Sequence, residues 1–311
     1  MLRKSTDKVL HLCINLPVKM SEMTSHPGRP YLIRVGNQLL SLERPVVMGI
    51  INVTPDSFYD GGRYDTAEMA RLKAGQMLAD GASMIDVGAC STRPGSPPVD
   101  QETEKERLKP VLHHIRKSYP EAVISVDTFR SSIAAWVVKE FDVQIINDVS
   151  GGRLDPDMFR TIGRLKVPYV LMHMQGTPNS MQNNPVYQDI VGDISVFLYE
   201  RISELRSYGV SDIILDPGFG FGKTIDHNYE LLSRLDEFAI FDMPLLVGMS
   251  RKSMIYKVLN NSPESALNGT SVLNTVALLH GASILRVHDV KQAVEAINLV
   301  QKLKMSYGFS V

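Results

Sequence analysis

The chain has 311 residues, which suits either one large α/β barrel or two ordinary domains. Its formal net charge of -1 excludes bulk attraction to nucleic acid or to an acidic membrane, so we expect a small-molecule partner. The two cysteines, Cys13 and Cys90, fit no metal or redox spacing and favour a reducing cytoplasm, and no apolar run approaches the roughly 20 residues of a membrane span.

The first part of the chain differs from the rest. A basic start and an apolar stretch resemble a signal peptide, but His11, Asn15 and Pro17 interrupt the stretch and no small-x-small cleavage site comes after it. We therefore reject export. We expect residues 1–29 to be a poorly ordered extension, or the product of a misplaced start, and residues 30–311 to form a single domain.

A β-hairpin is predicted at the start of this domain. From Tyr31 to Arg44, apolar and polar residues alternate on either side of Gly36-Asn37, a dipeptide typical of tight turns. We expect this hairpin to close one end of the domain.

A repeated unit comes after the hairpin: a short apolar run stops at a polar residue, and an amphipathic helical pattern continues the chain. The apolar runs are 46–51, 83–87, 123–126, 143–146, 169–172, 213–215, 245–247 and 284–287. The helical patterns are 66–79, 101–117, 131–140, 156–164, 190–208, 228–237, 266–280 and 290–304. Continuous apolar runs indicate parallel strands covered on both faces. About eight such units in about 250 residues predict a (β/α)8 TIM barrel, with an open doubly wound sheet as the alternative.

The stretch 212–224, which reads D-I-I-L-D-P-G-F-G-F-G-K-T, predicts a buried strand that runs into a functional loop. Its glycines allow close approach of the backbone to a ligand, and Phe219 and Phe221 offer flat apolar surface that suits a planar heterocycle. The glycine spacing fits neither a Walker loop nor the dinucleotide-binding fingerprint. An ordinary strand-to-helix turn is the alternative interpretation.

Polar residues stand at the end of every predicted strand, where a barrel places its catalytic groups. In chain order they are Asn52, Asp86 with the 91–93 loop, Asp127, Asn147, His173, Asp216, the Ser250-Arg251-Lys252 group, and Arg286 with His288. Any one of them could be an ordinary polar residue at a strand terminus. Their presence at all eight ends favours a site.

Two chemical sets can be distinguished within this ring. The first suits a planar heterocycle with several N–H donors beside carbonyl and ring-nitrogen acceptors, and consists of Asp127, Asn147, Asp216 and Lys252. The second is cationic and suits a polyanion such as a diphosphate, and consists of Arg93, Arg286 and His288, with Asn52 beside them.

Eight motifs, in order from about Pro45 to about Lys304, resemble those of bacterial dihydropteroate synthase, a pterin-binding TIM-barrel family. They are I-I-N-V-T-P-D-S-F-Y-D-G-G (50–62), S-T-R-P-G (91–95), S-V-D-T-F (125–129), I-N-D-V-S-G-G (146–152), L-M-H-M-Q-G (171–176), D-P-G-F-G-F-G-K (216–223), G-M-S-R-K-S (248–253) and R-V-H-D-V (286–290). The resemblance implies a transferase that condenses 4-aminobenzoate with (7,8-dihydropterin-6-yl)methyl diphosphate, giving 7,8-dihydropteroate and diphosphate for folate biosynthesis. It also implies Mg²⁺, a cytoplasmic location, a homodimer through the last helices, and sulfonamides as mimics of aminobenzoate.

The resemblance assigns roles residue by residue. The pterin would be held by Asp127, Asn147, Asp216 and Lys252, with Met172 packing nearby. Asn52 would reach Mg²⁺, and the diphosphate would be bound by Arg93, Arg286 and His288. The aminobenzoate site would be lined by Phe58, Thr92, Pro94, Phe221 and Ser253, and Asp60 would help to join the two loops.

The chemistry of the substrates predicts a dissociative substitution. An aryl amine is a weak nucleophile, so the enzyme helps most by stabilising the departing diphosphate, and no general base is essential. A pterin-dependent corrinoid methyltransferase is an alternative, but the diphosphate set is present and we see no second domain for a corrinoid. A non-catalytic pterin carrier is another alternative, and it would need neither Asn52 nor Arg286.

Two loops predict an order of substrate binding. Residues 52–64 and 91–100 are rich in Gly, Pro, Ser and Asp, so we expect both to be mobile when the site is empty. The expected pterin ligands stand directly at strand ends, where a packed barrel holds them. The pterin substrate should therefore bind first and build the aminobenzoate site.

Overall fold

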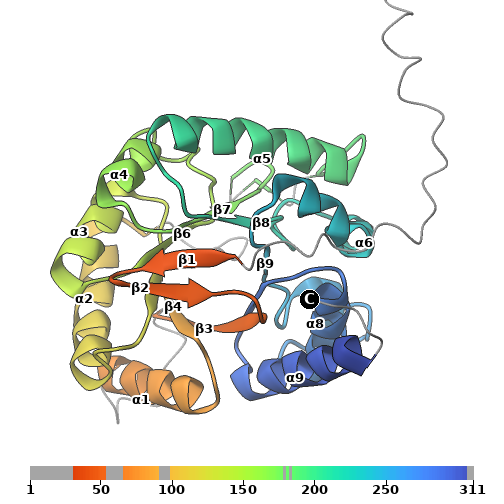
Figure 1. The fold of residues 1–311 in the computed structure, drawn as a ribbon, viewed down its shortest axis with the longest axis horizontal. Helices are drawn as coiled ribbons and strands as arrows, with labels where there is room; N and C mark the ends of the chain where they lie inside the picture. Colours follow the sequence, from red (N-terminus) through yellow and green to blue (C-terminus); the bar gives the residue numbers. More distant parts are fainter. Residues whose placement is uncertain (1–30, 54–65, 91–98, 178–179, 182–183, 307–311) are drawn as a thin grey trace, which may run out of the picture.

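The computed structural model describes residues 31–53, 66–90, 99–177, 180–181 and 184–306. Within them, eight parallel strands form one sheet in the order β8-β7-β6-β5-β4-β3-β10-β9, surrounded by helices (Figure 1). A parallel bridge between Leu215 and Leu245 brings the two edge strands together. The sheet is therefore a nearly closed barrel, which confirms the predicted (β/α)8 fold rather than an open sheet. The predicted extension, 1–29, lies outside the described residues.

The element bounds agree closely with the predicted runs. The barrel strands are β3 (Val46–Asn52), β4 (Met84–Gly88), β5 (Ile124–Asp127), β6 (Ile145–Asp148), β7 (Tyr169–Met172), β8 (Ile213–Asp216), β9 (Leu246–Val247) and β10 (Ile284–Val287). The helices are α1 (Thr66–Ala79), α2 (Gln101–Ser118), α3 (Ser131–Phe141), α4 (Met158–Leu165), α5 (Ile190–Ser207), α6 (Ile225–Ser233), α7 (Ser253–Tyr256), α8 (Leu267–Leu279) and α9 (Val290–Ser306), with the 3-10 helix η1 (Leu235–Phe241). None of the described helices combines the length and the apolar character needed to cross a bilayer.

The helix predicted over 228–237 differs most from the structure. Its first turn begins three residues earlier, at Ile225, because the Thr224 side chain accepts a hydrogen bond from the His227 backbone at 3.1 Å and Thr224 N donates back to His227 Nδ1 at 3.3 Å. This reciprocal capping satisfies backbone donors that a helix start otherwise leaves open. The helix ends at Ser233, and η1 then continues the chain.

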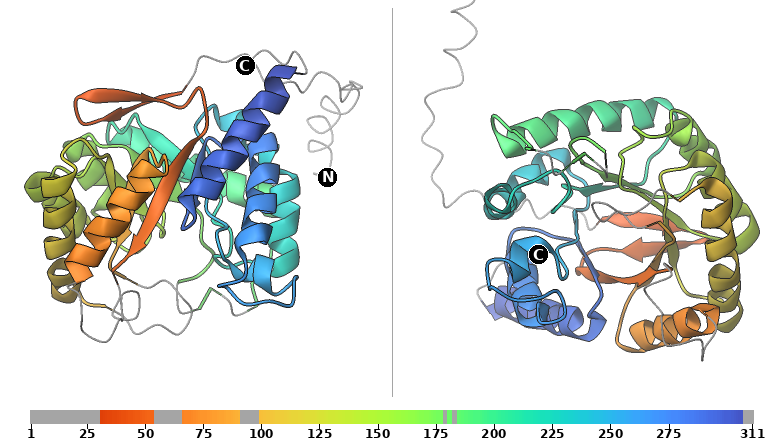
Figure 2. Two further views of the ribbon diagram at one scale, coloured as in Figure 1. Left: turned by 90° about the horizontal axis from the view of Figure 1, so that it is seen from below. Right: turned by 180° about the vertical axis from the view of Figure 1, so that it is seen from behind.

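The predicted hairpin is present and closes the amino-terminal end of the barrel. Strands β1 (Leu32–Val35) and β2 (Gln38–Ser41) pair in antiparallel register around Gly36, whose φ of 61° is a left-handed turn conformation. The left panel of Figure 2 shows the hairpin, in red, lying across one end of the barrel. Its buried residues Ile33, Val35 and Leu42 form one cluster with the inward-facing residues at the start of the barrel strands, which are Met48, Met84, Ile145, Val170, Ile214, Leu246 and Ile284.

The alternation of side chains along each strand then fixes what lies at the opposite end. Residues two positions apart share one face of a strand, so each apolar residue of this inner layer precedes a second inward-facing residue. Four such pairs are Met84 and Asp86, Ile145 and Asn147, Ile214 and Asp216, and Ile284 and Arg286. The outer strand faces instead pack on the helices in the large core cluster. The barrel is therefore apolar inside at the hairpin end and polar inside at the carboxyl end of its strands.

We expect the hairpin to contribute directly to stability. Replacing Ile33, which is 2% exposed, by Ala should lower the free energy of unfolding by about 2 to 5 kcal/mol, because the substitution leaves a cavity between the hairpin and the inner layer. Leu39 lies on the same hairpin but is 66% exposed, so Leu39→Ala is the matched control and should change little. Urea unfolding measures both, and equal effects would show that the hairpin does not seal the core.

Candidate active site

Arg286, on β10, lies between two carboxylates of other strands. Its Nε donates to Asp86 Oδ2 at 2.7 Å, and its Nη2 lies 2.6 Å from the same oxygen and 3.1 Å from Asp127 Oδ2. Asn147 Nδ2 also donates to Asp86 Oδ2, at 3.0 Å. Strands β4, β5, β6 and β10 thus contribute to one hydrogen-bonded network inside the barrel.

The charge states in this network depend on burial. Burial alone would lower the pKa of Arg286, but attraction to Asp86 and Asp127 outweighs it and raises the pKa, so the guanidinium is charged. Burial raises the pKa of Asp127 to about 7, against the attraction of Arg286. N–H groups that a ligand donates to Asp127 would therefore lower its pKa again and favour its ionised form.

Asp216 and Lys252 lie at a second part of the same end of the barrel. Burial raises the pKa of Asp216, opposed first by Lys252 and then by the Gly218 N–H, which donates to Asp216 Oδ1 at 2.7 Å. Burial lowers the pKa of Lys252 to about 8, against the attraction of Asp216. Lys252 Nζ donates to Phe219 O at 2.5 Å and lies 4.5 Å from the centre of the Phe221 ring. This ammonium therefore connects the carboxylate side of the site with its aromatic side.

The glycine-rich turn after β8 packs closely on the end of β7. Gly218 has a φ of 75°, and a Cβ there would lie 1.8 Å from His173 O. At Gly222 a Cβ would lie 2.7 Å from Gln175 O. The sequence predicts that the glycines allow close approach to a ligand; at these two positions the close approach is to neighbouring backbone, which seats the turn against β7.

An apolar cluster adjoins this turn. Met172, at the end of β7, is buried with Val149, Met174 and Met181, and the cluster is flanked by Phe129 and Phe221. The structure thus brings together Met172, predicted to pack beside the pterin, and Phe221, predicted for aminobenzoate. Both belong to one apolar surface next to Lys252.

Two basic residues at the strand ends, His288 and Arg251, do not offer free positive charge to a ligand. Burial first, and then Lys73 and Arg286, lower the pKa of His288 to about 3, so its ring is neutral at pH 7. His288 Nδ1 lies 3.1 Å from Ser250 Oγ, which also accepts from the His288 backbone N–H at 3.2 Å. Arg251 makes two hydrogen bonds with Asp289, at 2.9 and 2.7 Å, and is therefore committed to a structural ion pair. Among the described members of the predicted diphosphate set, Arg286 therefore carries the positive charge.

Two further predicted residues lie at the expected end of the barrel. Asn52 ends β3, and Ser253 begins α7 directly after Lys252. The predicted residues that lie outside the described part of the chain are Phe58, Asp60, Thr92, Arg93 and Pro94.

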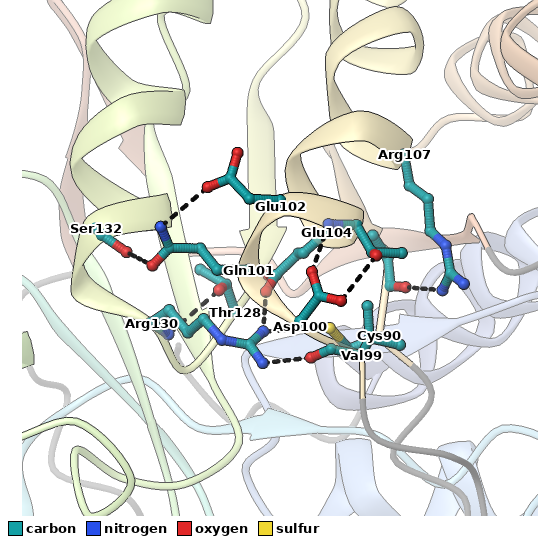
Figure 3. Close-up of polar contacts among 12 residues, drawn as sticks. Cys90, Val99, Asp100, Gln101, Glu102, Glu104, Arg107, Thr128, Arg130 and Ser132 are labelled. Atoms are coloured by element: carbon teal, nitrogen blue, oxygen red, sulfur yellow. Dashed lines mark hydrogen bonds and ion pairs between the residues drawn. The ribbon is translucent and has the colours of Figure 1, made fainter.

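Both described residues that flank the 91–98 segment contact Arg130 (Figure 3). Its Nη2 donates to Val99 O, and its Nη1 donates to Cys90 Sγ at 3.7 Å and pairs with Glu104, a fully buried carboxylate on α2. Arg130 also lies over the Phe129 ring at 4.6 Å. The residues on either side of the segment are thus held by one side chain at the start of α3.

Sequence reasoning misses two buried residues of the site. Asp86 is evident from the sequence as a strand-end residue but has no role there, although three hydrogen-bond donor atoms converge on its Oδ2. Lys223 stands out in the sequence only as a lysine that fails the Walker spacing, yet it is 3% exposed and sits beneath the glycine-rich turn. In the sequence, the only indication of such a role for Lys223 is that a charged residue comes directly after the glycine-rich turn.

Comparison with known proteins decides the family. The family model for pterin binding enzymes matches residues 48–288, which include all the strand-end residues of the site. The dihydropteroate synthase of Escherichia coli K12 is 44% identical over 264 residues, covering 84% of this chain and 93% of that protein. The chain belongs to the dihydropteroate synthase family. Solved dihydropteroate synthases agree: that of Yersinia pestis with a sulfonamide drug complex has a TM-score of 0.83 at 39% identity, covering 88% of this chain and 100% of that one. That of Xanthomonas albilineans with 4-aminobenzoic acid has a TM-score of 0.83 at 36% identity, covering 89% and 99%.

We expect Asp86 to hold the dihydropteroate synthase site together. Asp86→Asn removes the charge that pairs with Arg286, so the free energy of unfolding should fall by about 1.5 to 3 kcal/mol. Glu230→Gln, in an exposed ion pair with Arg234, is a matched carboxylate control and should change stability much less. Urea unfolding compares the two variants, and a silent Asp86→Asn would contradict the assigned role.

Proposed function

We propose that this chain condenses 4-aminobenzoate with (7,8-dihydropterin-6-yl)methyl diphosphate, giving 7,8-dihydropteroate and diphosphate in folate biosynthesis. The supporting observation is the buried network that places Arg286 beside Asp86, Asp127 and Asn147 at the carboxyl end of the barrel. The family membership and the solved relatives, one with 4-aminobenzoic acid and one with a sulfonamide, support the same reaction.

The pterin half of the site would be formed mainly by residues on barrel strands, with Lys252 at the start of α7. Asp127, Asn147 and Asp216 supply oxygen acceptors from three strands, and Lys252 supplies a donor. A planar heterocycle with N–H groups and ring nitrogens along its edge can use both kinds of partner. Met172 and its apolar neighbours would pack against the ring face.

The leaving group would be bound by the cationic side. Arg286 is charged and already positioned by Asp86, so it need not reorganise as negative charge grows on the departing diphosphate. Preorganised donors of this kind are worth about 3 to 4 kcal/mol each in well-studied enzymes. Arg93 and His288 would add donors, and a nearby diphosphate would raise the pKa of His288 from its low value. We therefore propose a dissociative substitution in which diphosphate leaves before the amine bond is formed.

The site could supply only part of the coordination shell of Mg²⁺, and the substrate would supply further ligands. The described residues contain no group of three or more His, Cys, Asp or Glu side chains that could hold a metal. Asn52 ends β3 on the same inner face as Met48 and offers one amide oxygen. Mg²⁺ commonly takes one or two protein oxygens together with substrate phosphates, and when bound it would neutralise charge on the diphosphate.

We further propose a cytoplasmic homodimer that contacts through the last helices. Helices α8 and α9 expose large apolar side chains to solvent: Val272, Leu279, Leu299 and Leu303. Helices α8 and α9 contact each other, so burying these side chains against a second copy of the chain would remove apolar surface from water.

The direct test is an assay for 7,8-dihydropteroate and diphosphate from the two purified substrates with Mg²⁺. Formation of both products supports the proposal. Pterin binding without diphosphate release would instead favour a carrier, and methyl transfer to a corrinoid would favour the methyltransferase alternative.

Two variants should fail in different ways in this assay. Asp127→Asn replaces an acceptor by a group that also donates, so pterin affinity should fall by about 1 to 3 kcal/mol. Arg286→Ala removes stabilisation that grows as diphosphate leaves, so kcat should fall more than pterin affinity does. Calorimetry and steady-state kinetics separate the two effects, and equal losses of binding and turnover in both variants would refute the assigned roles.

The binding order is also testable. We expect the pterin substrate with Mg²⁺ to bind first, because most of its proposed ligands stand on barrel strands, whereas Phe58, Thr92 and Pro94 of the proposed aminobenzoate site belong to sequences rich in Gly, Pro, Ser and Asp. Calorimetric titration of the free enzyme with 4-aminobenzoate or a sulfonamide should show weak binding that tightens after pterin, diphosphate and Mg²⁺ are added. Tight binding to the free enzyme would contradict ordered assembly.

A further inference from the structure

Lys223 is a buried lysine whose ammonium faces neutral acceptors from two segments of the chain. Its Nζ donates to Gly218 O at 2.9 Å and to Phe221 O at 3.1 Å, and it lies 3.1 Å from His173 Nδ1. These three acceptors match the three N–H bonds of an ammonium group. Among the described residues, no carboxylate forms an ion pair with Lys223.

A lysine in this position is costly, which argues against simple packing. Burial lowers the pKa of Lys223 to about 7, against the attraction of Asp216. An apolar residue of similar size would avoid this desolvation. Burial first, and then Lys223 itself, lower the pKa of His173 to about 2, so the ring is neutral and its Nδ1 can accept the hydrogen bond.

The contacts of Lys223 fix the part of the turn that carries the site. Gly218 and Phe221, whose carbonyls accept from Lys223, stand on either side of Phe219 in the sequence, and the Phe219 carbonyl accepts from Lys252 Nζ. The Phe221 ring lies under the same Lys252 ammonium. Tyr187 in addition donates from its hydroxyl to Gly222 O at 2.7 Å, so a second side chain also holds the turn.

We propose that Lys223 is a positioning residue for the reaction, and this inference rests on the proposed function. By tying the 217–222 turn to His173 at the end of β7, Lys223 holds Phe221 and Lys252 where the pterin and the aminobenzoate meet. Its acceptors are protein carbonyls and an imidazole, so it does not act as a phosphate-binding lysine of the Walker type.

The test compares Lys223→Met with Lys304→Met. Lys304 is a matched control because it is half-buried and its Nζ donates to the carbonyl of Leu278 on α8, a helix that carries none of the site residues. In Lys223→Met, the KM for aminobenzoate and the Kd for the pterin diphosphate should each rise by about tenfold, the effect of losing one well-formed hydrogen-bonded contact. Lys304→Met should leave both constants at the wild-type values.

Comparing the change in KM with the change in kcat distinguishes a positioning role of Lys223 from a merely structural one. A structural defect reduces the fraction of active enzyme, which lowers the apparent kcat and leaves KM unchanged. Lys223→Gln removes the charge and one N–H donor but keeps two N–H groups. It therefore serves as the test variant if Lys223→Met does not fold, and its KM for aminobenzoate should rise several-fold. Wild-type KM and Kd in the folded variants would overturn this inference while leaving the proposed function intact. Absence of product from the wild-type enzyme would remove both.

Discussion

The buried ion pair between Arg286 and Asp86 is the interaction on which the site depends. A guanidinium inside a barrel requires a compensating charge, and Asp86, with no exposed surface, supplies it. The same carboxylate oxygen orients Asn147, so one interaction fixes a cation and an amide on different strands. Asp127 is the more distant partner of Arg286, and burial raises its pKa, so N–H donors from a ligand would favour its ionised form. The protein thus holds the charges of the site in place by itself.

The barrel makes this arrangement rigid by separating apolar and polar layers along each strand. The hairpin and the inner apolar layer close one end, and a step of two residues along β4, β6, β8 and β10 brings Asp86, Asn147, Asp216 and Arg286 to the other. The proposed reaction needs this division. A weakly nucleophilic amine gains most when the departing diphosphate meets charges that are fixed beforehand, and fixed charges require a packed layer beneath them.

The sequence predicts the repetitive features well, because each depends on local pattern. Continuous apolar runs identify the parallel strands, and the polar residue after each run identifies the ring at their ends. Features that depend on distant partners could not be predicted. Asp86 and Arg286 are 200 residues apart, so the role of Asp86 emerges only when the barrel brings them together. The neutral state of His288 results from burial and nearby cations, and the role of Lys223 from a turn folded over it.

A kinetic isotope effect tests the central claim that fixed interior charges act on the departure of diphosphate. The pterin substrate would carry deuterium on the methylene that bears the diphosphate, and the labelled and unlabelled substrates would compete in one reaction so that the effect on kcat/KM is measured. We predict that the deuterated substrate reacts more slowly, because the methylene carbon becomes trigonal as the diphosphate leaves. Equal rates, together with a pH profile that requires a catalytic base, would contradict this account.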